Sequence, residues 1–264
     1  MLSYFSFIKK TVYQKAIPGL LLFGLIFSIK ITSARNNRNY TNQFFHFTNY
    51  AHKNDTAYLS GLINELKKKW PVNRNINLVF HGHSVPSGYF KTPNVNTFGS
   101  YPYLLLKSLN EKYPYAVINI IKTCIGGENA EQGAKRLKKD VLIYKPDVLF
   151  IDYGLNDRTI GLARAKAAWE KMIRQALRKK IKVILLTPTP DIKENILDDN
   201  VLLMQHTRQI IELGKQYHIP VIDSYGAFKK LSEQGADIGK YMAQSNHINE
   251  AGHKVVANLL FQLF

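Results

Sequence analysis

Short apolar runs alternate with amphipathic segments along most of this chain, and this alternation restricts the possible folds more than any other feature. Each run is rich in β-branched residues and too short for a helix, which is typical of buried strands. The five runs lie at residues 76–80, 116–121, 148–151, 183–186 and 221–222. Helical periodicity marks the segments that follow, for example residues 162–176 and 255–263. Because helical crossovers join parallel strands, the sequence predicts an α/β protein, a three-layer α/β/α sandwich around a five-stranded, doubly wound parallel sheet.

The first 55 residues differ in character from the rest. Three lysines precede an uncharged stretch at residues 16–29, and small residues follow at positions 32–34. This pattern is typical of an export signal, and the stretch is short for a membrane-spanning helix, so an uncleaved anchor is the alternative. We expect residues 1–34 to be a signal peptide or N-terminal membrane anchor, residues 35–55 a linker or arm, and residues 56–264 one folded domain that is exported.

Composition limits what else the chain can be. With 264 residues, 45% of them hydrophobic, it suffices for one domain with a substantial core. Cys124 is the only cysteine, which excludes an intramolecular disulfide. The formal net charge is +17, and since residues 1–34 hold four lysines and no acids, the remainder keeps +13.

The basic residues gather in three clusters near the ends of expected helices, Lys67-Lys68-Lys69, Arg136-Lys138-Lys139 and Arg178-Lys179-Lys180. Cations suit the negative end of the helix dipole, so solvated helix ends are the favoured interpretation. A dedicated polyanion site is the alternative, because a strongly basic field attracts anionic partners. No nucleic-acid partner is expected, and membrane contact is expected only through an uncleaved N-terminal segment.

Two stretches carry a candidate nucleophile and a candidate base. Ser84, in Gly82-His83-Ser84, follows an expected strand and would be presented at the carboxyl edge of the sheet, where ligands bind in such folds. A helix-capping serine is the alternative. His247 lies just before the last helix and could take the serine proton. His253, farther into that helix, is expected to be exposed to solvent. His81 and His83 have no convincing third partner for zinc, so no metal and no organic cofactor is predicted.

Two further stretches offer hydrogen-bond donors for an oxyanion. Gly126 and Gly127 are expected to open a helix, where backbone N–H groups have no intrahelical partner and Gly127 leaves room for a substrate. In Gly154-Leu155-Asn156-Asp157, the Asn156 amide could donate to the same oxyanion. A glycine-rich connector and an Asx-type turn are the respective alternatives.

Taken together over residues 74–264, the four stretches resemble the sequence blocks of the SGNH, or GDSL-like, hydrolase superfamily. The resemblance implies the flavodoxin-like SGNH fold and a serine esterase without a cofactor. It implies Ser84 as the nucleophile, His247 as the base, and an oxyanion hole formed by the Ser84 amide, Gly127 and Asn156.

The chain departs from the superfamily pattern at two positions. His83 stands where the superfamily usually has aspartate, and Gln244 stands three residues before His247 where the third catalytic residue is usually aspartate. A glutamine carbonyl can accept the Nδ1–H of a histidine and hold the useful tautomer, but it cannot offset the charge of an imidazolium. We therefore expect Gln244 to be a weaker third member of the site. The carboxylates that could replace it are Asp157, Asp191 and Asp223.

The expected function is an exported serine esterase that hydrolyses carboxylic esters through an acyl-serine intermediate. The preferred substrate is O-acetylated carbohydrate, as a small molecule or a polysaccharide. The alternatives are a lysophospholipase or thioesterase acting on lipid, acyl transfer to an alcohol, and a catalytically weak glycan- or polyanion-binding module of the same fold.

Overall fold

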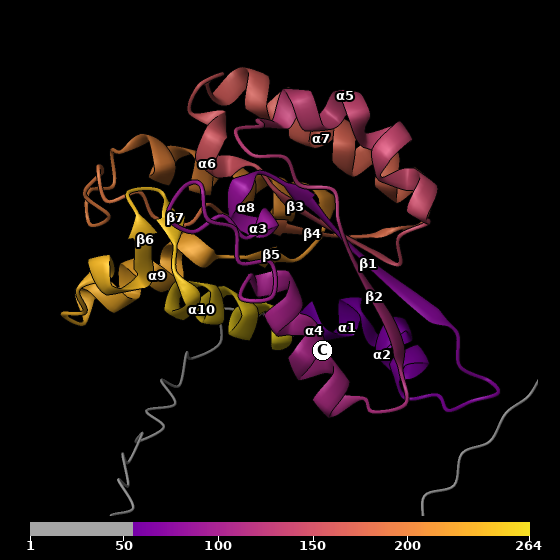
Figure 1. Ribbon diagram of the computed structural model, residues 1–264. Helices are drawn as coiled ribbons and strands as arrows, with labels where there is room; N and C mark the ends of the chain where they lie inside the picture. The colour runs from indigo at the N-terminus through magenta and orange to yellow at the C-terminus, as the bar shows by residue number, and fades with distance from the viewer. Residues whose placement is uncertain (1–54) are drawn as a thin grey trace, which may run out of the picture. The chain divides into compact units, whose positions relative to one another are not determined.

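The computed structural model describes residues 55–264, and the predictions made for residues 1–54 lie outside this range. Its centre is a sheet of five parallel strands in the order β2-β1-β3-β4-β5, which confirms the predicted fold class (Figure 1). The strands are β1 (Asn75–Gly82), β2 (Val117–Lys122), β3 (Val148–Asp152), β4 (Lys182–Leu186) and β5 (Val221–Ile222). Each lies within a residue or two of its expected position. A two-stranded antiparallel hairpin follows later in the chain, β6 (Met242–Gln244) and β7 (His247–Ile248).

Helices cover both faces of the sheet (Figure 1). One face carries α1 (Asp55–Tyr58), α2 (Ser60–Leu66), α4 (Tyr101–Lys112), α9 (Ser224–Glu233) and α10 (Glu250–Phe261). The other face carries α5 (Ala130–Asp140), α7 (Leu162–Arg178) and α8 (Leu202–Tyr217). Short one-turn elements join them, namely α3 (Ser84–Ser87), α6 (Gly154–Asp157) and the 3-10 helices η1 (Leu142–Tyr144) and η2 (Ile238–Tyr241).

The sheet separates two hydrophobic cores because side chains alternate along each strand. On β3, Phe150 packs into the core under α4 and α10, whereas Leu149 and Ile151 pack into the core under α5 and α7. Phe80 on β1 is the register partner of Phe150, and the two rings stack with centroids 4.2 Å apart. The central strands are therefore buried on both sides, which explains why they appear in the sequence as continuous apolar runs.

Because the strands are parallel, their carboxyl ends all lie at one edge of the sheet and their amino ends at the other. The carboxyl ends of β1, β2 and β3 lead into α3, the turn before α5, and α6, respectively. At the other end, the carboxyl ends of the helices lead into the next strand. Within residues 55–264, no helix has the length and apolar character needed to cross a bilayer.

Candidate active site

Ser84 lies where β1 turns sharply into α3. The turn requires Gly82, because a Cβ at that position would lie 2.4 Å from the carbonyl oxygen of Asp152 on β3. His83 caps α3 in an extended conformation, and its Nδ1 accepts the Val85 N–H at 3.2 Å. Ser84 is thus the first residue of α3, and N–H groups in the first turn of a helix have no intrahelical acceptor. The Ser84 hydroxyl and its own amide are both placed at the carboxyl edge of the sheet.

His247 contacts Ser84 directly although 163 positions separate them. Its Nε2 lies 2.8 Å from the Ser84 Oγ. Its Nδ1 lies 2.9 Å from the carbonyl oxygen of Phe90. A carbonyl can only accept, so Nδ1 carries the proton and Nε2 presents its lone pair to the serine hydroxyl. Burial lowers the pKa of His247 from its ordinary value, which keeps the ring neutral and able to accept a proton.

Gln244 does not hold His247 in the way that the sequence suggests. Its Oε1 accepts the Thr92 N–H at 2.9 Å, and its Nε2 donates to Asn246 at 3.1 Å. The Phe90 carbonyl occupies the place at Nδ1 that was expected for Gln244. Gln244 instead fastens the β6–β7 hairpin to the loop that carries Phe90, and so acts on His247 only through that loop.

None of the three candidate carboxylates binds His247 in the described part of the chain. Each is engaged by a different donor: Asp157 by Trp169, Asp191 by Arg158 and Asp223 by Thr187. The third member of the arrangement is therefore a main-chain carbonyl. No sequence motif could have revealed it, because every residue carries that group and only the path of the loop brings Phe90 to the ring.

The sequence predicts that Gly126 and Gly127 open a helix. In the structure Gly127 lies instead in a turn ahead of α5. The helix begins at Ala130, where Asn129 and Gln132 form a reciprocal capping box. Gly127 has φ +78°, and a Cβ there would meet no atom within 4 Å. The positive φ favours glycine, and the open space is where a substrate can approach. Among the described residues, no acceptor is bonded to the Gly127 N–H.

Asn156 lies beside this turn. It follows β3 in the short helix α6, and its Nδ2 donates to the carbonyl oxygen of Glu128 at 2.8 Å. A side-chain amide has two N–H groups, so one remains for another acceptor. Meanwhile, the Ile125 N–H donates to the Gly82 carbonyl at 3.0 Å, and the Ser87 hydroxyl donates to the Cys124 carbonyl at 3.1 Å. These bonds join the three segments that carry the expected oxyanion donors.

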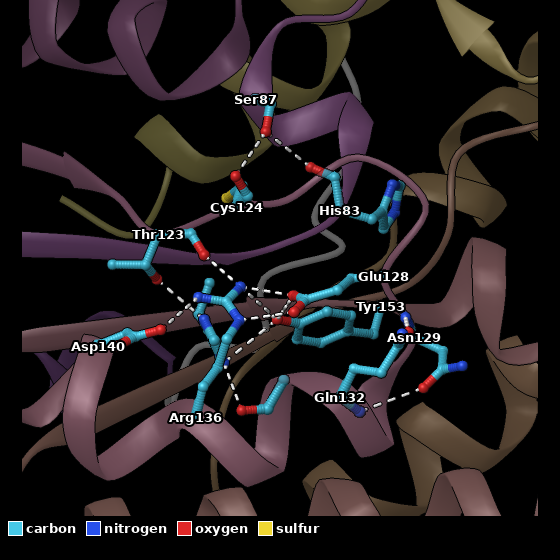
Figure 2. Close-up of polar contacts among 12 residues, drawn as sticks. His83, Ser87, Thr123, Cys124, Glu128, Asn129, Gln132, Arg136, Asp140 and Tyr153 are labelled. Atoms are coloured by element: carbon cyan, nitrogen blue, oxygen red, sulfur yellow. Dashed lines mark hydrogen bonds and ion pairs between the residues drawn. The ribbon is translucent and has the colours of Figure 1, made fainter.

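A partly buried ionic cluster involves Glu128, the residue after Gly127, together with Arg136 and Tyr153 (Figure 2). The Arg136 guanidinium donates to both carboxylate oxygens of Glu128, at 2.7 and 2.5 Å, and to the carbonyl oxygen of Thr123 at 2.5 Å. Tyr153 donates to Glu128 at 3.1 Å. Arg136 thereby ties together the two ends of the turn. The sequence had placed Arg136 in a solvated basic cluster, but its side chain is only 15% exposed, and this interpretation is wrong.

His81 completes the cluster from β1. Its Nδ1 lies 2.9 Å from the Thr123 hydroxyl, and its Nε2 lies 3.2 Å from the Tyr153 hydroxyl. Burial, reinforced by the charge of Arg136, lowers the pKa of His81 to about 4, so the ring is neutral. Both ring nitrogens of His81 are therefore engaged by groups of the protein itself. Within residues 55–264, no group of three or more His, Cys, Asp or Glu side chains is arranged to hold a metal ion.

A second buried network contacts His83, in the turn that carries Ser84. His83 Nε2 lies 3.3 Å from one oxygen of Asp152, and Tyr101 donates its hydroxyl to the other at 2.9 Å. The Tyr101 N–H in turn donates to His253 Nδ1 at 3.2 Å. His253 is fully buried, contrary to the sequence-based expectation, and burial lowers its pKa to about 3. Its ring stacks on that of Phe90, with centroids 5.1 Å apart, which joins α10 to the loop whose carbonyl contacts His247.

The parallel sheet and the serine–histidine contact at its carboxyl edge are features of a serine hydrolase. The sequence profile of the GDSL-like Lipase/Acylhydrolase family matches residues 80–255, more than half of the chain, so the chain belongs to that family. As a member of that family it is a carboxylic ester hydrolase, which confirms the resemblance seen in the sequence.

Solved structures show the same fold. A two-domain esterase active on acetylated mannans is 19% identical with a TM-score of 0.64, and the match covers 78% of this chain and 52% of that one. The present chain thus spans about half the length of that esterase. Axe2, an acetylxylan esterase from Geobacillus stearothermophilus, is 20% identical with a TM-score of 0.62, covering 71% of this chain and 93% of that one. No curated protein sequence matches this chain.

Proposed function

We propose that this protein is an exported esterase that removes acetyl groups from O-acetylated carbohydrate, with Ser84 as nucleophile and His247 as general base. The observation that carries the proposal is the 2.8 Å contact between the Ser84 Oγ and His247 Nε2. The substrate class is supported by two structural neighbours that are described as acting on acetylated mannans and as an acetylxylan esterase.

Acylation begins when the Ser84 Oγ attacks the ester carbonyl carbon and its proton passes to His247 Nε2. The carbonyl oxygen becomes an oxyanion, which accepts hydrogen bonds from the Ser84 and Gly127 N–H groups and the Asn156 amide. The tetrahedral intermediate collapses as the bond to the sugar oxygen breaks. His247 gives its proton to that oxygen, which leaves as a hydroxyl and leaves the acetyl group on Ser84.

Deacylation repeats these steps with water. His247 takes a proton from water as the hydroxide oxygen attacks the acyl carbon, and then returns the proton to the Ser84 Oγ as acetate departs. In both steps the imidazolium is held by the Phe90 carbonyl, 2.9 Å from Nδ1. That bond fixes the tautomer. The carbonyl offers the imidazolium a dipole and not a full negative charge, so in this proposal it orients the ring without the charge compensation of a carboxylate.

Tyr89 favours a short acyl group. Its ring lies near both His247 and the Gly126–Gly127 turn. The ring centroid is 6.0 Å from that of His247, and the Cζ is 3.4 Å from where a Cβ on Gly126 would lie. A ring in this position restricts the room beside the Gly126–Gly127 turn. An acetyl group needs little space there, whereas a long acyl chain needs a path past the ring.

A panel of esters tests the proposal. The purified chain should hydrolyse p-nitrophenyl acetate and acetylated xylan or mannan oligosaccharides, and Ser84→Ala should lose nearly all of this activity. Tyr89→Ala should raise the rate on octanoyl relative to acetyl esters. A wild-type preference for long acyl chains would favour the lipid hydrolase. Activity no higher than that of Ser84→Ala would favour the binding module.

Two parts of the proposal need separate measurements. Transfer of the acetyl group to an added sugar, seen by product analysis, would favour an acyltransferase over a hydrolase. Cell fractionation tests export, and sequencing of the mature N-terminus tests cleavage near residue 34. Recovery of the protein in the cytoplasm with its first residue intact would contradict both expectations.

A further inference from the structure

The topology places several groups of basic residues at one end of this domain. Every crossover helix runs back from the active-site edge, so its carboxyl end and the start of the next strand lie at the opposite edge of the sheet. The three basic clusters noted in the sequence, apart from Arg136, fall at or next to these junctions, between α2 and β1, between α5 and β3, and between α7 and β4. In Figure 1 these junctions lie on the opposite side of the view from α3, α6 and β7.

We call this region the basic end and define it as residues 67–74, 112–117, 138–145 and 178–182. All its lysines and arginines are exposed, namely Lys67, Lys68, Lys69, Arg74, Lys112, Lys138, Lys139, Lys145, Arg178, Lys179, Lys180 and Lys182. Asp140 is the only acidic residue in these ranges, and two neighbouring carboxylates, Glu65 and Asp147, pair with Lys68 and Arg74. Because the clusters lie on adjacent junctions, charges that are separate in the sequence add to one strongly positive surface.

Large apolar side chains are exposed on the same end. Trp70 is 85% exposed, Val72 69% and Tyr115 54%, and Ile143 and Tyr144 are also exposed, at 61% and 42%. Single exposed apolar side chains are common, but a group of them beside cations is typical of an interaction site.

Hydrogen bonds and a cation–π contact join the segments that carry these side chains. Asn73 donates to the Tyr115 carbonyl at 2.9 Å, and Lys69 Nζ lies 4.4 Å from the centre of the Tyr115 ring. On the other side, Asn77 donates to the Tyr144 carbonyl at 2.8 Å. The loop before β1 therefore contacts the loop before β2, and β1 itself contacts η1 near its start, so the exposed aromatic and aliphatic side chains belong to one region.

We propose that the basic end docks on an anionic lipid bilayer. Lysines and arginines would meet lipid phosphates and acidic headgroups, and Trp70, Val72 and Tyr115 would enter the interfacial layer, where tryptophan and tyrosine are favoured. Lipid is favoured over a soluble polyanion because exposed valine and isoleucine side chains gain only from an apolar phase. Since the site and the basic end are at opposite edges of the sheet, docking leaves Ser84 facing away from the bilayer.

The chain contains its own reporter for this contact. It has two tryptophans, Trp70 and Trp169, and Trp169 is buried with its indole N–H bonded to Asp157. A change of tryptophan emission on adding vesicles therefore reports on Trp70. With the full-length chain and vesicles of phosphatidylglycerol and phosphatidylcholine, we expect a blue shift that Trp70→Phe abolishes. Pure phosphatidylcholine vesicles should give no such shift.

Charge variants test the electrostatic part. Replacing Lys67, Lys68 and Lys69 by glutamate should weaken binding to the anionic vesicles by at least about 100-fold, because each lysine contributes about 1 kcal/mol near a charged bilayer and each glutamate adds repulsion. The matched control, Lys166→Glu with Lys193→Glu and Lys240→Glu, makes the same change in net charge on exposed lysines outside the basic end and should bind nearly as well as wild type.

Three results would overturn the proposal. One is vesicle binding without a Trp70 shift, which would mean that the N-terminal apolar segment alone holds the chain. Another is equal weakening by both charge variants. The third is tight binding to a soluble anionic polysaccharide with no binding to anionic vesicles, which would assign the basic end to a polyanion. None of these measurements depends on esterase activity, so the docking proposal and the proposed function fail independently.

Discussion

Replacing Arg136 by methionine would remove the side chain that ties together the two ends of the Gly127 turn. The substitution leaves the Glu128 carboxylate, 9% exposed, without its bidentate partner, and the Thr123 carbonyl without its donor. Breaking a buried pair on one side typically costs about 3 to 5 kcal/mol. Because the pair is only partly buried, we expect the lower figure, about 3 kcal/mol, or a fall in Tm of roughly 6 to 12 °C for a domain of this size.

The same change should lower kcat more than it raises KM, because the proposed role of the Gly127 N–H is to stabilise the oxyanion and not the bound ester. The matched control is Arg164→Met, which removes another bidentate arginine–glutamate pair, with Glu131, whose side chains are 62% and 29% exposed. Chemical denaturation and steady-state kinetics on acetyl esters measure both effects. If Arg136→Met is as stable and as active as Arg164→Met, the clamp has no role in holding the turn.

Three further predictions concern the site and the buried histidines. Asn156→Ala should lower kcat by about 10²- to 10³-fold with little change in KM, as for loss of one oxyanion donor, and an unchanged kcat would remove Asn156 from the mechanism. The acid limb of kcat/KM should lie below pH 6.5, because burial lowers the pKa of His247 and only the neutral ring can act as base; a limb centred at pH 7 or above would contradict this. The free energy of unfolding should fall as the pH drops below about 6.5, by up to about 1.4 kcal/mol per pH unit for each of His81 and His253. The reason is that both histidines are protonated in the unfolded chain at these pH values, whereas in the folded protein their pKa values are about 4 and 3 and the rings stay neutral. Denaturation curves at pH 7, 6 and 5 measure the slope, and His253→Gln should reduce it.

The sequence predicted the sheet well because strand periodicity and burial are local signals. Each expected run became a strand, since a β-branched segment buried on both faces has few other conformations. The contact between Ser84 and His247 followed from topology, because both segments lie at the carboxyl edge of a parallel sheet. The boundary of α5 was less well placed, since the capping box of Asn129, and not the glycines, starts the helix.

The support of the site was not predictable from sequence. The Phe90 carbonyl takes the position expected for a side chain at residue 244, and main-chain groups leave no trace in a sequence. Arg136 falls in a basic cluster, and only the way in which α5 packs under the Gly127 turn turns its side chain toward Glu128. His253 was expected at the surface because a single histidine in an amphipathic helix does not reveal which face is buried.

Labelling with a fluorophosphonate tests the central claim most directly, because the reagent bonds to an activated serine hydroxyl and does not depend on the substrate. The label should be found on the peptide that contains Ser84, should be absent in Ser84→Ala, and should be greatly slowed in His247→Gln. Esterase activity in a chain whose label lies on another serine, or that carries no label at all, would contradict the Ser84–His247 mechanism.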